Sequence, residues 1–269
     1  QPNEFSKPVL FFWDNNIKEY IVDDDVQKVL PFIYYPRRIS STINPKTGLI
    51  HIFFAGTGFD LADYDLSKGW ENFPPNCGAQ NNLITYDPSS GEAAEIPLPK
   101  LYDFSHGLAV SDMNNDQIAG YILLNSPYIK FPGKYLFNGV DYKNESYILY
   151  SNKKGDFDKV NIKFNYKRIF NKPTITAGLA IVDENDDTFL LLGSEEPGDG
   201  IYAFKQDTKT SFTETSSVSA PTIMRADGKT GAYSDVVYGD VDEDGTKEVV
   251  ASIATHNWKG RLYTIIWFY

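Results

Sequence analysis

Short apolar runs alternate with acid-rich polar turns along the chain, and the same arrangement recurs. Three stretches align with one another: HGLAVSDMNNDQIAGYILL (106–124), AGLAIVDENDDTFLLLGS (177–194) and SDVVYGDVDEDGTKEVVAS (234–252). In each, an apolar run precedes a turn that opens at Asp112, Asp183 or Asp240, and a second apolar run follows. A weaker copy turns at Asn44. One pattern repeated within a single chain predicts a repeat architecture.

A second element lies between these turns. It consists of an aromatic-rich apolar run, a polar turn and an alternating run, as in NLITYDPSSGEAAEIPL (82–98), SYILYSNKKGDFDKVNI (146–162) and GIYAFKQDTKTSFTETS (200–216). This pattern is typical of a β-hairpin. VLFFWDNNIKEYIVDD (9–24) reads as a further hairpin, and RLYTIIWFY (261–269) as the first half of one.

Each repeat therefore contains about four strands, and no segment shows a helical period over a dozen residues. Four-stranded units that bury their faces against neighbours are typical of β-propeller blades. We expect an all-β fold in which residues 1–269 form a single β-propeller domain. The head and tail of the chain together have the length of one repeat, which favours four blades; five blades, or a fragment of a larger ring, stay open.

The turn that opens at Asp240 has the spacing of a metal loop. Asp240, Asp242 and Asp244 occupy positions 1, 3 and 5, a glycine follows, and Glu248 stands at position 9. Calcium takes 6–8 oxygen ligands, and a curled loop directs alternate side chains toward one point. Thr246 offers its main-chain carbonyl at position 7. The alternative is an exposed acidic turn, where Asp and Gly are common for conformational reasons.

This Asp-x-Asp-x-Asp-Gly-x-x-acid pattern between two apolar strands resembles the FG-GAP and VCBS repeats of integrin-α-like β-propellers. The resemblance implies a calcium ion bound between the first two strands of a blade. It also implies a ligand set, which is Asp240, Asp242, Asp244 and Glu248 through side chains and Thr246 through its main chain. An EF-hand is excluded because that motif needs a glutamate at position 12 and flanking helices, whereas position 12 here is Ala251.

The other turns depart from the pattern. Asp112, Asn114 and Asp116 keep positions 1, 3 and 5, but Gln117 replaces the glycine and Gly120 stands where the closing acid is expected. We predict a second, less complete calcium site there.

Charge and composition narrow the choice of partners. The net charge of −11 argues against nucleic acid, because a polyanion would be repelled. No run reaches the roughly 18 apolar residues of a membrane helix, so membrane insertion is not expected. Calcium loops of modest affinity fill outside the cytoplasm. We therefore expect an extracellular or cell-surface protein, with the periplasm as an alternative.

Two long insertions interrupt the repeats, at residues 56–82 and 125–146, and both are rich in aromatic side chains. Loops of this length are commonly functional. The candidate ligand-binding residues are Trp70, Phe73, Tyr128, Tyr135, His106 and Trp258. They favour a surface for a glycan or an extracellular protein, although the aromatic residues of the insertions also suit a structural role in covering blade edges.

These features predict a calcium-stabilised, lectin-like binding or adhesion module without catalytic residues. The alternative is a carbohydrate-active enzyme, a glycosidase or polysaccharide lyase, on the same scaffold. Candidates for its chemistry are His106, His256, Asp103 and Arg261. No nucleophile elbow, phosphate loop or dinucleotide fingerprint is present.

Overall fold

The structure is a computed structural model, and strands dominate it. It describes residues 7–31, 36–56, 79–99, 102–103, 105–125, 136–137, 140–141, 146–152, 156–165, 176–184, 187–194, 201–218, 232–258 and 261–268. A single six-residue helix, α1 (Asp24–Val29), occurs in these ranges. The expectation of an all-β fold is confirmed.

The first two repeats each form a four-stranded antiparallel sheet. The first sheet contains β3 (Pro36–Ile43), β4 (Ile50–Gly56), β6 (Asn82–Tyr86) and β7 (Ala93–Ile96). The second contains β9 (Ser105–Ser111), β10 (Gly120–Asn125), β13 (Tyr147–Ser151) and β14 (Phe157–Asn161). In both, two strands around the acidic or polar turn are followed by the hairpin, as the sequence pattern predicts.

The third sheet has one strand more, and the fourth sheet has three strands. The third contains β16 (Thr176–Glu184), β17 (Asp187–Ser194), β18 (Ile201–Thr208) and β19 (Ser211–Val218), and β15 (Lys163–Asn165) joins it parallel to β19. The fourth contains β20 (Ala232–Gly239), β21 (Glu248–Trp258) and β22 (Arg261–Phe268).

Three two-stranded ladders complete the described strands. They are β1 (Phe11–Asp14) with β2 (Glu19–Val22), β5 (Ala79–Gln80) with β8 (Tyr102–Asp103), and β11 (Leu136–Phe137) with β12 (Val140–Asp141). The hairpin β1–β2 is the one expected near the N-terminus. In the described residues it forms a sheet separate from β20–β22, so head and tail do not merge into one sheet there.

Each pair of consecutive sheets encloses a hydrophobic core. The apolar runs recur in the sequence because every sheet buries its faces against its neighbours. The first and second sheets share a cluster that includes Phe53 and Tyr121, whose rings stack at 4.6 Å between centroids. The second and third share a cluster around Ile148 and Phe204. The third and fourth share a smaller one around Val236.

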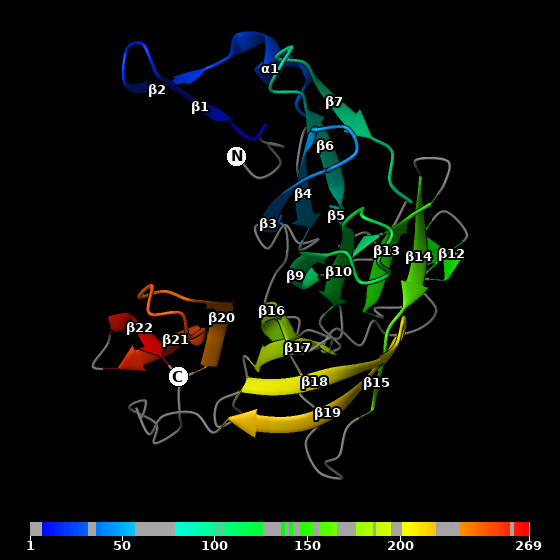
Figure 1. The fold of residues 1–269 in the computed structure, drawn as a ribbon, viewed down its shortest axis with the longest axis vertical. Coiled ribbons are helices and arrows are strands. Elements are labelled where there is room, and N and C mark those ends of the chain that lie inside the picture. Colours follow the sequence, from blue (N-terminus) through cyan, green and yellow to red (C-terminus); the bar gives the residue numbers. More distant parts are fainter. Residues whose placement is uncertain are drawn as a thin grey trace.

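The first strands of the four sheets lie next to one another, β3 beside β9, β9 beside β16 and β16 beside β20. An ion pair between Arg38 of β3 and Asp235 of β20 then links the first sheet to the fourth. Figure 1 shows the sheets following one another around the molecule. This is the arrangement of a β-propeller, with the first strand of each sheet innermost.

The third turn lies later than its sequence suggests. Asp183 was expected to open an acidic loop, but it belongs to β16 and pairs with Thr188 of β17, and Glu184 pairs with Asp187. The ladder continues past Asp183 because strand pairing satisfies the backbone groups that an open loop would leave to side chains or solvent.

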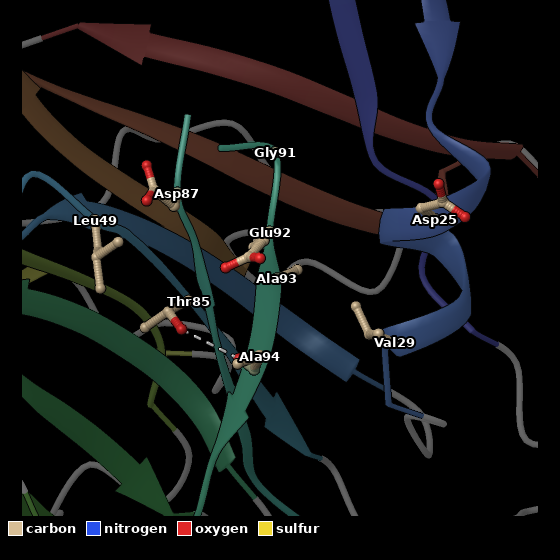
Figure 2. Close-up of a pocket in the computed structure, with 9 residues that line it drawn as sticks. All are labelled: Asp25, Val29, Leu49, Thr85, Asp87, Gly91, Glu92, Ala93 and Ala94. Atoms are coloured by element: carbon tan, nitrogen blue, oxygen red, sulfur yellow. Dashed lines mark hydrogen bonds between the residues drawn. The ribbon is translucent and has the colours of Figure 1, made fainter. Parts of the chain in front are cut away.

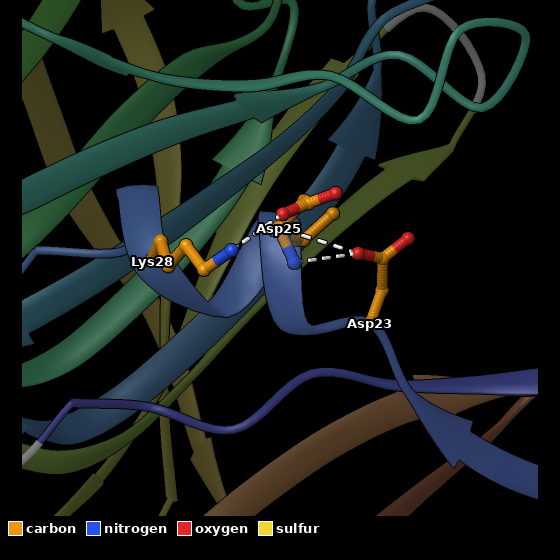
Figure 3. Close-up of polar contacts among 4 residues, drawn as sticks. Asp23, Asp25 and Lys28 are labelled. Atoms are coloured by element: carbon orange, nitrogen blue, oxygen red, sulfur yellow. Dashed lines mark hydrogen bonds and ion pairs between the residues drawn. The ribbon is translucent and has the colours of Figure 1, made fainter.

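Helix α1 was not expected, because six residues are too few to show a helical period. Asp23 caps it by accepting hydrogen bonds from the backbone N–H groups of Asp25 at 2.9 Å and Val26 at 3.1 Å, and Lys28 pairs with Asp25 (Figure 3). Val26 and Leu30 are buried against the outer face of the first sheet. The helix and the preceding hairpin thus cover a face that would otherwise be exposed.

Removing the cap should loosen this cover. We expect Asp23→Ala to weaken the helix by about 1 kcal/mol, the usual value of an N-cap, so that amides of residues 26–30 exchange with solvent about fivefold faster. Hydrogen exchange measures this directly. Asp24→Ala removes the same charge from the same turn and should have a smaller effect. Equal exchange in the two variants would show that charge, and not the cap, matters.

Candidate functional site

The sheets present two edges, and one of them carries buried polar groups. In the first three sheets the first strand begins where the second ends, as the pairs Pro36–Gly56, Ser105–Asn125 and Thr176–Ser194 show. In the fourth, Ala232 at the start of β20 pairs with Ala254, and β21 continues to Trp258. We call this edge the rim. The opposite edge carries the polar turns, two of which touch: Lys46 donates to the carbonyl oxygen of Asp116 at 2.8 Å.

Buried hydrogen bonds hold the rim of the first two sheets together. Asn81 is 3% exposed. Its Oδ1 accepts from the Gly56 N–H at 2.8 Å, and its Nδ2 donates to Tyr147 Oη at 2.8 Å. Ser105 donates to Asn125 Oδ1 at 3.1 Å. Buried polar groups paired in this way fix the geometry of the rim.

The ion pair on the rim brings a carboxylate to the innermost strands. Arg38 Nη1 lies 3.0 Å from Asp235 Oδ2, and the Asp235 side chain is half exposed. The two residues are 197 positions apart in the sequence. No local motif around either residue predicts the ion pair. The sequence analysis therefore missed both.

The predicted aromatic ligand-binding residues Trp70, Phe73, Tyr128 and Tyr135 lie outside the described residues. Strands β4 and β10, which precede the two insertions, end on the rim. His106 is the second residue of β9, and Trp258 is the last residue of β21.

The candidates for enzyme chemistry lie in strands. His256 belongs to β21, which runs for eleven residues. Asp103 lies in the short strand β8, two residues before β9 begins. The third histidine, His51 of β4, is 7% exposed, and its Nδ1 lies 3.2 Å from Tyr121 Oη. Burial lowers the pKa of His51 and raises that of Tyr121.

The turn between β20 and β21 gathers three of the predicted calcium ligands. Carboxylate oxygens of Asp240, Asp242 and Asp244 lie within 4.8 Å of one another, and all three side chains are exposed. Each carboxylate also accepts a backbone N–H bond within the turn: from Gly245, Asp244 and Thr246, respectively. Gly245 has φ +89°, which a residue with a Cβ adopts only with strain.

This donor set fits a hard cation. Each of the three carboxylates keeps one oxygen that does not take part in these backbone bonds, and oxygen is the ligand that calcium prefers. Glu248 is not part of the group of three; its Oε2 accepts from the Val241 N–H at 3.0 Å. That bond ties the end of the turn to its beginning.

Hydrogen bonds fill the turn of the second sheet more completely. Asp112 accepts backbone N–H bonds with both oxygens, from Asp116 and Gln117. Asp116 accepts from Ile118 and from the Asn114 amide. The Asn114 Oδ1 atom is buried without a hydrogen-bond partner. The second calcium site stays a prediction.

A pocket of about 520 Å³ lies between α1 and the turn that joins β6 to β7. Its acidic side chains are Asp25, Asp87 and Glu92 (Figure 2). Two of them already have partners: a hydrogen bond from Lys28 lowers the pKa of Asp25, and one from the Ser89 hydroxyl lowers that of Asp87. We place the candidate site at the rim, because buried and hydrogen-bonded polar side chains gather there.

Comparison with known proteins gives likeness in fold. No family model and no curated protein matches the sequence. Among solved structures, an exo-β-1,3-galactanase from Phanerochaete chrysosporium with β-1,3-galactotriose has a TM-score of 0.50 at 11% identity. The match covers 94% of this chain and 51% of the galactanase, so the chain spans about half its length. The GH43_1 enzyme from Xanthomonas citri complexed with xylose also scores 0.50, at 10% identity, with 90% and 74% covered.

These neighbours are β-propeller glycosidases, so the predicted β-propeller fold is confirmed. They also correct the predicted function. A non-enzymatic binding or adhesion module was favoured, but the two solved structures reported above are glycosidases, which favours the enzyme alternative. The FG-GAP and VCBS resemblance led to the wrong prediction because it describes turns, which carry no information about the rim.

Proposed function

We propose that the chain is a glycosidase that binds a glycan at the rim of its β-propeller. The observation that carries the proposal is the likeness in fold to two carbohydrate-processing enzymes, combined with a half-exposed carboxylate on the innermost strands. Glycosidases use a pair of carboxyl groups on either side of the scissile bond. Asp235 is our candidate for one, and Asp103 for the other.

A neutral glycan suits this protein better than an acidic one. The net charge of −11 would repel a uronate-rich polysaccharide. This favours glycoside hydrolysis over a lyase reaction on an acidic polymer. β-1,3-Galactan and xylan oligosaccharides are the first probes, since the neighbours' complexes contain galactotriose and xylose.

The rim supplies position and rigidity for this chemistry. The pairs Asn81–Tyr147 and Ser105–Asn125 are buried, so they fix the rim of the first two sheets, and Ser105 lies two residues from Asp103. Arg38 restricts the rotamers of Asp235 by its ion pair. A carboxylate that is fixed but still accessible can meet a bound sugar without a large rearrangement.

The activity test is hydrolysis of β-1,3-galacto- and xylo-oligosaccharides, followed by chromatography of the released sugars. We expect turnover by the unaltered protein and a loss of 10²-fold or more in Asp235→Asn, the usual range for an acid or base group. Asp156→Asn removes an exposed carboxylate at the opposite edge and should keep activity. Lack of turnover on both glycans, or full activity in Asp235→Asn, would contradict the proposal.

We also propose that the turn 240–248 binds calcium, as its spacing and converging oxygens support. The ion would join the ends of β20 and β21, at the edge opposite the rim, so its role is stability and not catalysis. Loops with affinities of 10⁻⁴–10⁻³ M serve extracellular modules, and we place the protein outside the cytoplasm on that basis. No helix in the described part of the chain has the length and apolarity to cross a bilayer.

A further inference from the structure

One ionisable side chain is buried between the first and second sheets and has no part in the proposed hydrolysis. His51 is the second residue of β4, close to the edge opposite the rim, and it is 7% exposed. Its Nδ1 atom lies 3.2 Å from the hydroxyl oxygen of Tyr121 in β10, which is within hydrogen-bonding distance. The contact therefore connects the second strands of two neighbouring sheets.

The hydrophobic core fixes the position of the Tyr121 hydroxyl. Tyr121 is fully buried. Its ring stacks on that of Phe53 at 4.6 Å between centroids and meets the ring of Phe157 edge-on at 5.6 Å. All three side chains belong to the cluster between the first two sheets. Turning the hydroxyl away from His51, or admitting water in its place, would therefore disturb that cluster.

The groups that face His51 are uncharged. Its register partners are Thr42 of β3 and Thr85 of β6, and Tyr121 faces it from β10. The charged side chains that come next along these elements lie in the polar turns: Lys46, Asp87 and Asp116. Burial lowers the pKa of His51, and no charged side chain in the described part of the chain counteracts this effect.

Protonation of His51 would place a charge in this core. A neutral imidazole has one donor and one acceptor nitrogen, so either partner of the His51–Tyr121 bond can donate. In the imidazolium both nitrogens donate, and the positive charge faces a neutral hydroxyl. Burying a charge without an opposite charge is costly. The folded protein therefore resists protonation at this position.

Acid should destabilise this contact. Below about pH 6.5, the ordinary pKa of histidine, the unfolded chain binds a proton at His51 that the folded chain takes up only at lower pH. The unfolded state then holds more protons, so the free energy of unfolding falls as the pH falls through this window. Above it, His51 is neutral in both states and its contribution is constant.

The two strands that carry this contact also end in the hydrogen bonds of the rim. β4 runs from His51 to Gly56, whose N–H donates to the buried Asn81 side chain at 2.8 Å. β10 runs from Tyr121 to Asn125, whose side chain belongs to the second buried pair of the rim. A change in how β4 packs on β10 at one edge therefore reaches the rim through two short, continuous strands.

We propose that His51 is an acid-sensitive contact between the first and second sheets. When His51 is neutral, its bond to Tyr121 holds β4 against β10. When His51 is protonated, the two strands separate more often, and the buried pairs of the rim open with them. The device depends on the packing of these two sheets and not on the proposed glycosidase activity.

Hydrogen exchange of the amides of β4 and β10 tests the proposal. Rates are measured at about pH 5 and about pH 7.5, in excess calcium and at constant ionic strength, and each is divided by the intrinsic rate at that pH. We expect these amides to open at least roughly threefold more often at the lower pH, and those of β17 and β18 in the third sheet to change less. Equal acceleration in both places would contradict a local effect.

Single substitutions assign the effect to His51. The side chain of His51→Gln can still form a hydrogen bond with Tyr121 but takes up no proton, so the pH dependence in β4 and β10 should disappear. His106→Gln is the matched control, because it removes an imidazole from β9 of the second sheet and should leave the pH dependence in place. A pH dependence that survives in His51→Gln, or that disappears in His106→Gln, would overturn the proposal.

Titration of the unaltered protein covers the case in which His51→Gln does not fold. Nuclear magnetic resonance of histidine-labelled protein follows the three imidazoles, with resonances assigned from His106→Gln and His256→Gln. We expect the pKa of His51 to lie below its ordinary value of 6.5, and amide opening to follow its titration. An ordinary pKa for His51 would refute the proposal whichever glycan the protein hydrolyses, and a lack of hydrolysis would leave it standing.

Discussion

Calcium should raise the melting temperature of the protein by roughly 5–10 °C, and Asp242→Asn should abolish this shift. A ligand at a hundred times its dissociation constant adds about 2.7 kcal/mol to the free energy of unfolding. In a large domain each kcal/mol corresponds to about 2–4 °C. The carboxylates of Asp240, Asp242 and Asp244 converge within 4.8 Å, so they repel one another until a cation is bound.

The control is another acid in the same turn. Glu243→Gln removes one negative charge but none of the expected ligands, so it should keep the calcium shift. Isothermal titration calorimetry of both variants separates ligation from general charge. A stoichiometry of two, reduced to one by Asp112→Asn, would assign the second turn as well. No heat and no thermal shift in the unaltered protein would rule out the calcium site.

Phe53→Ala should destabilise the protein by about 3–5 kcal/mol, the usual cost of removing a buried aromatic side chain. Phe53 has no exposed surface and stacks on Tyr121 of the second sheet. The substitution leaves a cavity between the first two sheets. The cavity cannot collapse fully, because each of these sheets is held in place by its other contacts. Urea denaturation measures the change in the free energy of unfolding.

Val29→Ala is a suitable comparison, because it truncates a half-exposed side chain on the same part of the molecule. It should cost less than 1 kcal/mol. If Phe53→Ala were equally mild, the stacked pair would not be holding the first two sheets together, and the blade-to-blade core described above would be wrong at this junction.

The sequence predicted the strands well because each blade repeats one local pattern. Apolar alternation placed both strands around Asp112 and both around Asp240. The same signal failed at Asp183, since an acid in a tight hairpin and an acid in a loop look alike without the pairing register. The N-cap residue Asp23, with Lys28 in the last turn, is the signal that would have found α1.

The rim was harder to predict, because its contacts join residues far apart in the chain. Asn81 and Tyr147 form a hydrogen bond between the first and second sheets, and Arg38 and Asp235 form an ion pair between the first and fourth. No local spacing encodes such contacts. The turn 240–248 is the opposite case: Asp240, Asp242 and Asp244 lie within five positions, so the convergence of their carboxylates could be predicted from the sequence.

Strand β15 affects how firmly the sheets are held to one another. It follows the second sheet directly, yet it pairs with β19 of the third, and the Tyr150 hydroxyl donates to the carbonyl of Lys209 nearby. These hydrogen bonds connect the second and third sheets at their outer strands. Between the first and fourth sheets, the described link is a solvent-accessible ion pair, and such pairs contribute little. Of the junctions between sheets, the one beside Asp235 is therefore the junction that the described contacts stabilise least.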